Sequence, residues 1–261
     1  MKKSAYVAIA LVLAVVTSGC GSDADASVTE PTGTSTPVEA SASPFIDPLD
    51  RLPAQPFGVD AAKIVADPAQ FGIQWQMGED QSAEAVAEAL TVFLQVQWLA
   101  NERQTYIAGP DRDKIQGSLK DAEHFVAPEH LEPLRKAAAD GLAYTALHEK
   151  EGDDTAPPSE QIYYPFHLGE VGGGPSDAIP FDVSSGMQLT PRISHVFGRQ
   201  EGHPVDINIR AYLDYEVTLV DGRMAVVSYP SWYGMRNVDG EWKVDGWTFN
   251  YHDAEPTVTT K

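Results

Sequence analysis

Two side chains in the last third of the sequence have types suited to proton transfer. His195 shares its parity with the apolar Ile193 in an alternating run, and Tyr215 shares its parity with Leu213. We therefore expect both side chains to face the apolar interior and to line a candidate pocket there. No inward carboxylate orients His195 and no second catalytic group is evident. Packed core residues are the simpler interpretation, and we expect a protein that is not an enzyme.

Arg210 and Tyr212 are the candidates for contact with a partner. Both occupy the polar side of the alternating run from Val205 to Val220. A solvated face is the simpler interpretation. However, Arg and Tyr are residue types that interfaces concentrate, and a basic side chain is conspicuous on a chain of net charge −20. We hypothesise that these residues lie at the centre of a contact with a second copy or with another protein.

Other signals for catalysis or metal binding are weak. The sequence has no Gly-x-Ser-x-Gly elbow, no His-Glu-x-x-His zinc motif and no lysine after the triple glycine at 172–174. His124 and His130 are separated by a proline at a spacing unlike that of helical metal ligands, and Asp153 with Asp154 lacks the alternating oxygens of a calcium loop. We expect no metal and no cofactor.

The composition is that of a globular, acidic protein. The chain has 261 residues, of which 43% are hydrophobic, and its 18 basic and 38 acidic residues give the net charge of −20. This length allows one large domain or two small ones. Phosphate binding requires clustered basic side chains, so we expect no nucleic-acid partner.

The periodicity predicts helices followed by strands. Apolar residues at three- and four-residue spacing, together with cap signals, predict helices over residues 82–103, 118–126 and 133–140, the last ending at Gly141. Alternation and two Asp-Gly turns predict strands over residues 188–199, 205–220, 223–235 and 241–252. Residues 149–186 are rich in Gly, Pro and Asp, and are expected to form a long loop insertion. The result is an α+β domain whose antiparallel sheet covers its apolar face with the helices.

The first twenty residues have the three parts of a secretory signal. Lys2 and Lys3 precede an apolar run over residues 5–16, and small residues lead to Cys20, the only cysteine. A helix of twelve residues covers about 18 Å, which is too short for a hydrocarbon core of roughly 30 Å. One interpretation of this pattern is an ordinary signal peptide followed by an ordinary, unmodified cysteine.

The segment Thr17–Cys20 resembles the signal of bacterial lipoproteins, with Thr17 in place of the more usual Leu. The resemblance implies lipidation of Cys20, removal of residues 1–19, and location on the extracytoplasmic face of the cell membrane. Residues 20–56 are dominated by Ser, Thr, Ala, Pro and acidic side chains and are expected to form a disordered tether. We expect the folded domain over residues 57–252 and a flexible tail over residues 253–261.

Residues 80 to 252 are expected to contain a long helix, two shorter helices with Ala-Pro-Glu at Ala127–Glu129, and a terminal hairpin at Val238–Trp247. This order of elements resembles the nuclear-transport-factor-2-like (NTF2-like) superfamily, which includes SnoaL-like enzymes. The resemblance implies a strongly bent antiparallel sheet wrapped around the helices as a cone with an interior pocket. The insertion at 149–186 departs from the compact pattern of that superfamily.

Three classes of function remain open. The first is a lipid-anchored cell-envelope protein whose domain binds another envelope or membrane protein without catalysis. The alternative is a small-molecule-binding lipoprotein that uses the cone pocket, and a SnoaL-like isomerase or hydratase is the least favoured. The expected partners are the membrane, through the lipid anchor, and an envelope protein or a second copy. The polarity of the interior distinguishes these classes, because a receptor requires an open pocket with convergent polar groups.

Overall fold

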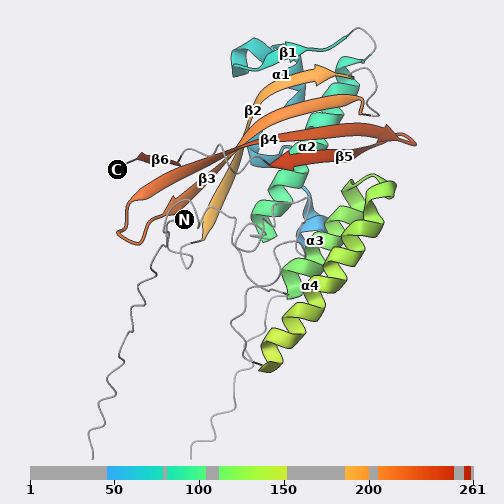
Figure 1. The fold of residues 1–261 in the computed structure, drawn as a ribbon. Coiled ribbons are helices and arrows are strands. Elements are labelled where there is room, and N and C mark those ends of the chain that lie inside the picture. Colours follow the sequence, from blue (N-terminus) through green and yellow to red (C-terminus); the bar gives the residue numbers. More distant parts are fainter. Residues whose placement is uncertain are drawn as a thin grey trace, which may run out of the picture. The chain divides into compact units, whose positions relative to one another are not determined.

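The computed structural model describes residues 46–78, 81–103, 112–151, 186–199, 205–249 and 256–259 (Figure 1). All of them belong to one compact unit, Phe45–Lys261. The signal segment, Cys20, most of the expected tether and most of the expected loop insertion lie outside the described residues. None of the helices that the structure describes is long and apolar enough to cross a membrane.

The domain is α+β. Its helices are α1 (Ala61–Ala66), α2 (Ala83–Arg103), α3 (Arg112–Phe125) and α4 (Leu131–Glu151), with short 3₁₀ turns at Pro48–Arg51, Pro56–Gly58, Pro68–Phe71 and Pro128–His130. Its strands are β1 (Gln74–Gln76), β2 (Met187–Gly198), β3 (Ile207–Thr218), β4 (Met224–Val238), β5 (Glu241–Phe249) and β6 (Pro256–Thr259). They form one sheet of order β1-β2-β3-β4-β5, and β6 pairs with β4.

Two of the three expected helices differ in their bounds from the sequence expectation, and α1 is not among those expected. The prediction for α2 is confirmed, and the Ser82 hydroxyl caps it by accepting a hydrogen bond from the Ala85 N–H at 3.1 Å. By contrast, α3 begins at Arg112, six residues before the expected Ser118. Helix α4 continues through Gly141 to Glu151. A single glycine costs a helix only about 1 kcal/mol, and the good helix formers that follow allow the helix to continue.

The sheet is mixed, whereas a wholly antiparallel sheet was expected. Strand β1 runs parallel to β2, while the β2–β3, β3–β4 and β4–β5 pairs are antiparallel. The expected flexible tail is also wrong in part, because β6 pairs antiparallel with Met224–Val227 of β4. Strand β5 pairs with the other end of β4, from Ser231 onward. Among the described strands, β6 thus pairs with the part of β4 that β5 does not reach.

One face of the sheet, called here the inner face, packs on α2. The helix contributes Leu90, Phe93 and Leu94, all 1% exposed or less, and the inner face contributes residues such as Ile209 and Tyr233. The rings of Phe93 and Tyr233 meet edge to face with centroids 5.0 Å apart. The space between α2 and the sheet is therefore filled by side chains around this contact.

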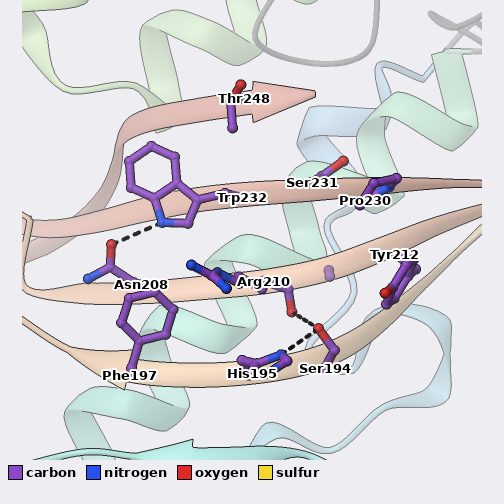
Figure 2. Close-up of a pocket in the computed structure, with 11 residues that line it drawn as sticks. Ser194, His195, Phe197, Asn208, Arg210, Tyr212, Pro230, Ser231, Trp232 and Thr248 are labelled. Carbon is purple, nitrogen blue, oxygen red and sulfur yellow. Dashed lines mark hydrogen bonds between the residues drawn. The ribbon is translucent and has the colours of Figure 1, made fainter. Parts of the chain in front are cut away.

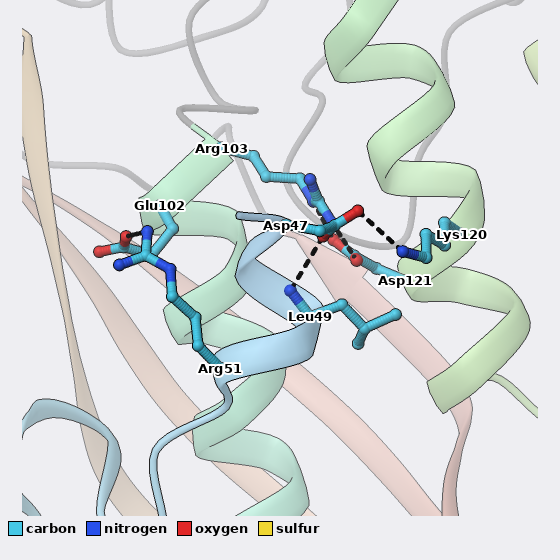
Figure 3. Close-up of polar contacts among 7 residues, drawn as sticks. All are labelled: Asp47, Leu49, Arg51, Glu102, Arg103, Lys120 and Asp121. Atoms are coloured by element: carbon cyan, nitrogen blue, oxygen red, sulfur yellow. Dashed lines mark hydrogen bonds and ion pairs between the residues drawn. The ribbon is translucent and has the colours of Figure 1, made fainter. Parts of the chain in front are cut away.

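The folded domain begins earlier than the expected Phe57. Residues 46–56 contain the 3₁₀ turn Pro48–Arg51, and Asp47 binds two helices at once (Figure 3). Its carboxylate accepts hydrogen bonds from Arg103 of α2 at 2.7 Å and from Lys120 of α3 at 2.8 Å. Arg103 also donates to Asp121 at 2.6 and 2.7 Å. We call Asp47, Arg103, Lys120 and Asp121 the clamp. These ion pairs explain why an apparently tether-like segment is folded.

Candidate binding pocket on the outer face of the sheet

A β-bulge in β2 decides which way His195 faces. Ile193 pairs with Ala211 and His195 pairs with the adjacent Arg210, so Ser194 is an extra residue without a partner in the ladder. The extra residue reverses the alternation of side chains. His195 therefore lies on the outer face, opposite to α2, although Ile193 remains on the inner face.

The expectation that His195 and Tyr215 line one interior pocket is wrong. Tyr215 lies on the inner face of β3, is 4% exposed and belongs to a second apolar cluster near the Asn101 end of α2. Its ring meets that of Tyr229 with centroids 5.6 Å apart. Arg210 and Tyr215 have opposite parity on β3, so the strand separates Tyr215 from the residue that pairs with His195. No proton transfer can connect the two side chains directly.

His195 instead belongs to a row of side chains that crosses four strands. The ladder aligns His195 of β2 with Arg210 of β3, Trp232 of β4 and Thr248 of β5. This row runs through a pocket of about 570 Å³ on the outer face (Figure 2). The lining residues are Ser194, His195, Phe197, Asn208, Arg210, Ala211, Tyr212, Pro230, Ser231, Trp232 and Thr248. We call this cavity the outer pocket.

Trp232 is held in place by hydrogen bonds, and its ring fits closely against the backbone of a glycine. Its indole Nε1–H donates to Asn208 Oδ1 at 3.0 Å, and Asn208 Nδ2 donates to the Gly198 carbonyl at 3.1 Å. Asn208 is only 4% exposed. A Cβ at Gly246 would lie 2.9 Å from the Trp232 ring, so the indole occupies space that only glycine leaves open. The ring is thus fixed before any ligand arrives.

The hydrogen bonds around Ser194 define the tautomer of His195. The Ser194 hydroxyl donates to the Arg210 carbonyl at 3.1 Å, because a carbonyl can only accept. The same hydroxyl lies 3.0 Å from His195 Nδ1. Since its proton is already directed to the carbonyl, Ser194 Oγ must accept from Nδ1–H. In the neutral ring, Nε2 is therefore the acceptor, and it has no hydrogen-bond partner among the described residues.

Arg210 gives the outer pocket a single fixed charge. Its guanidinium carbon lies 5.4 Å from the centroid of the Phe197 ring, and Arg210 forms no ion pair within the described part of the chain. Arg192, on the same face, stacks on Tyr212 at 4.5 Å but is also paired with Asp214 at 3.0 Å. None of the residues that line the outer pocket is acidic. The pocket is consequently positive on a chain of net charge −20.

The chemistry of the outer pocket favours binding. Ser194 is no activated nucleophile, because its proton points to a carbonyl and His195 donates to it rather than accepting from it. No carboxylate in the lining could orient His195 or act as a second catalytic group. The described residues contain no group of three or more His, Cys, Asp or Glu side chains placed to hold a metal ion.

A second polar cluster lies around Asp245, in the middle of β5. His130 Nε2 is 3.1 Å from the carboxylate of Asp245, which is 2% exposed and also lies 3.2 Å from Arg236. Arg236 also contacts Glu129. His130 is half exposed, but its ring is tied to the buried carboxylate of Asp245. These contacts join the 3₁₀ turn before α4 to the sheet, so their evident role is structural.

Three of the four expected binding residues meet in the outer pocket, namely His195, Arg210 and Tyr212, while Tyr215 is in the core. Sequence reasoning missed Trp232 and Asn208 as lining residues. Their parity on the outer side of β3 and β4 is a signal, but it identifies a pocket only once the strands are paired. No known protein family, curated protein or solved structure matches the chain.

Proposed function

We propose that this chain is a lipid-anchored protein of the bacterial cell envelope whose domain binds another envelope or membrane protein through the outer pocket. One observation carries this proposal. Arg210 and Tyr212 line a pocket together with a tryptophan and a histidine whose orientations are already fixed by hydrogen bonds. Fixing side chains in advance reduces the entropy lost on binding, which is typical of recognition sites. Tyr212 is 38% exposed and is thus accessible to a partner.

The lipid anchor is supported by Cys20 and the small residues before it. Labelled palmitate should enter the wild-type protein and should not enter a Cys20→Ser variant. Equal labelling of the two proteins would contradict the anchor. Because the mature chain would be strongly acidic, its surface would be repelled by anionic lipid, and attachment would then depend on the acyl chains alone.

The NTF2-like architecture is part of this proposal. Its support is the long α2 packed on the four strands β2–β5 and the two helices, α3 and α4, that lie between α2 and β2 in the chain. Strands β1 and β6 would be additions to the superfamily pattern. An experimental structure in which β2–β5 do not wrap around α2 as a bent sheet would contradict the assignment.

Photo-cross-linking tests the binding of a partner. With a benzoylphenylalanine at position 212, we expect a light-dependent adduct in cells. The matched control places the same group at Val220, which is 73% exposed in the turn between β3 and β4 and lies outside the outer pocket. Adding Arg210→Glu should abolish the adduct at position 212. Equal adducts at both positions, or none at position 212, would contradict partner binding through this face.

The small-molecule alternative is favoured by one observation. The volume of about 570 Å³ falls in the range of ligand pockets. Its site would be the outer pocket, because Phe93, Tyr233 and their buried neighbours pack the space between α2 and the sheet in the described part of the chain. Sedimentation of the purified chain separates a third option, self-association, from both.

A further inference from the structure

The charge of the outer pocket indicates what kind of group it binds. The chain has 38 acidic residues against 18 basic ones. The neighbouring Arg192 is paired with Asp214, and the buried Arg103 is paired with Asp47 and Asp121. Arg210 has no such partner in the described part of the chain, although it lies in a cavity with fixed walls. An arginine left without a carboxylate on so acidic a chain is complementary to an anion supplied by a ligand.

The neighbours of Arg210 specify what accompanies that anion. His195 and Trp232 are its direct neighbours on the two adjoining strands. Each therefore lies about 5 Å from Arg210 at Cβ, and Arg210 lies between the two, which are about 10 Å apart. His195 presents the Nε2 acceptor, which an N–H or an O–H of the ligand can fill. Trp232, with Phe197 and Pro230 nearby, presents apolar surface. Arg210, His195 and Trp232 thus provide one cation, one hydrogen-bond acceptor and one apolar surface.

We propose that the outer pocket captures the free C-terminal residue of a partner polypeptide. The α-carboxylate of that residue would pair with Arg210, its amide N–H would donate to His195 Nε2, and an apolar side chain would pack on Trp232. A C-terminal residue carries these three groups on one α-carbon, which matches the spacing of neighbouring strands. This inference rests on the proposed function, because it names the chemistry by which the partner is recognised.

Other ligands fit the pocket less well. A neutral sugar would leave the charge of Arg210 without an anion, and the amide of Asn208 is already occupied by Trp232 and Gly198. A second copy of the chain would bring the same large negative charge, which opposes association. A small carboxylate lacking an N–H would leave His195 Nε2 without a donor.

Four probes, titrated by calorimetry into the lipidated full chain in nanodiscs, test the inference. They are acetyl-Ala-Ala-Leu as the free acid, the same peptide as its C-terminal amide, acetyl-Ala-Glu-Leu amide, and 4-methylpentanoate. We expect the free acid to bind about tenfold more tightly than its amide, because a charge-assisted pair is lost in the amide. The internal glutamate and the small carboxylate should both bind more weakly than the free acid.

Matched variants assign the preference to the pocket. Arg210→Gln should abolish the difference between acid and amide. Arg192→Gln should retain it, because Arg192 lies on the same face but outside the lining. A peptide ending in N-methyl-leucine should bind the wild type several-fold more weakly than the parent acid, and this loss should disappear in His195→Ala.

Each contrary result overturns the inference. Equal binding of acid and amide, a preference that survives Arg210→Gln, or no binding of the free acid excludes capture of a C terminus. Binding of 4-methylpentanoate as tight as that of the free acid would identify a small carboxylate as the ligand. If the position 212 adduct forms while the peptides fail, the partner is recognised through other chemistry. If the peptides bind and the adduct is absent, partner binding in cells fails instead.

Discussion

The clamp and the outer pocket are both built around an arginine, but the arginine of the clamp is buried and paired, whereas that of the pocket is exposed and has no carboxylate partner among the described residues. The Arg103 side chain is 8% exposed and pairs with two carboxylates that belong to other parts of the chain. Arg210 is exposed, lies over Phe197 and has no carboxylate partner in the described residues. The clamp bonds join elements that are distant in sequence, whereas the pocket bonds orient side chains on neighbouring strands.

This difference separates stability from recognition. A buried arginine must be neutralised within the fold, because an unpaired buried charge is strongly destabilising. The fold has no such requirement for Arg210, since solvent hydrates its guanidinium. The charge of Arg210 therefore remains available for a ligand. The charge of Arg103 is neutralised by Asp47 and Asp121, and these pairs hold the segment 46–56 on α2 and α3.

The largest expected effect comes from replacing each arginine by methionine. Arg103→Met should lower the free energy of unfolding by about 3 to 5 kcal/mol, because the buried carboxylate of Asp121 loses its arginine partner and Asp47 loses one of its two basic partners. Arg210→Met should change it by no more than about 0.5 kcal/mol. Urea denaturation of the two variants measures both values. Similar losses would show that the two arginines do not differ in role.

The contribution of the clamp to the free energy of unfolding should decrease in acid, because Asp47 becomes protonated there. Burial raises the pKa of Asp47, but hydrogen bonds from Lys120, Leu49 and Arg103 outweigh it and hold the pKa well below its ordinary 3.8. The stabilisation is therefore present above about pH 4 and is lost as the pH falls further. Asp47→Asn should lower the free energy of unfolding by about 2 kcal/mol at pH 7.

Denaturation curves of wild type and Asp47→Asn at several pH values check this prediction. The difference between the two proteins should be constant from pH 7 to about pH 5 and should shrink below pH 4. Asp60→Asn is the control, because Asp60 caps α1 through its own backbone neighbours and not through the clamp. A difference that grows in acid would have the wrong sign for a lowered pKa.

The sequence predicted the regular elements better than their faces. The periodicity and the turn residues predict the long strands and α2. The alternation also predicts the outer position of Arg210 and Tyr212 correctly, because β3 has no bulge. His195 was placed on the wrong face because a single inserted residue at Ser194 leaves an apparent alternation on both sides of it. Pro191, inside the same strand, is a weak sequence signal of irregular pairing.

The clamp could not be predicted for a different reason. Asp47 is separated from Arg103 by 56 residues and from Lys120 by 73 residues, so no local pattern links them. The composition of residues 20–56 is that of a disordered segment, yet its last part is held on the domain by Asp47, which faces two basic side chains, and by Leu49 and Leu52, which pack on the core. Strand β6 was likewise missed because four residues are too few to show a period.

A smaller loss of stability is expected within the outer pocket. Asn208→Ala leaves the Trp232 Nε1–H and the Gly198 carbonyl without their partner. The free energy of unfolding should fall by about 1 to 2 kcal/mol, which is less than for Arg103→Met. Because Trp232 is no longer fixed, binding of the acetyl-Ala-Ala-Leu acid should also weaken. A variant that loses stability but keeps full binding would show that Trp232 needs no positioning.

The smallest effect on stability is expected at Ser194. Unlike the clamp residues, Ser194 orients a side chain of the outer pocket and contributes little to the stability of the fold. Ser194→Ala removes the hydroxyl that bridges His195 Nδ1 and the Arg210 carbonyl, but the bulge is made by the backbone and remains. The free energy of unfolding should change by no more than about 0.5 kcal/mol. The tautomer should respond strongly, because nothing then holds the proton on Nδ1. Nitrogen-15 NMR of the His195 ring should show an Nδ1-protonated neutral ring in the wild type and a mixture of tautomers in the variant. An unchanged tautomer would mean that Ser194 does not orient His195, and that the acceptor at Nε2 is set by some other contact.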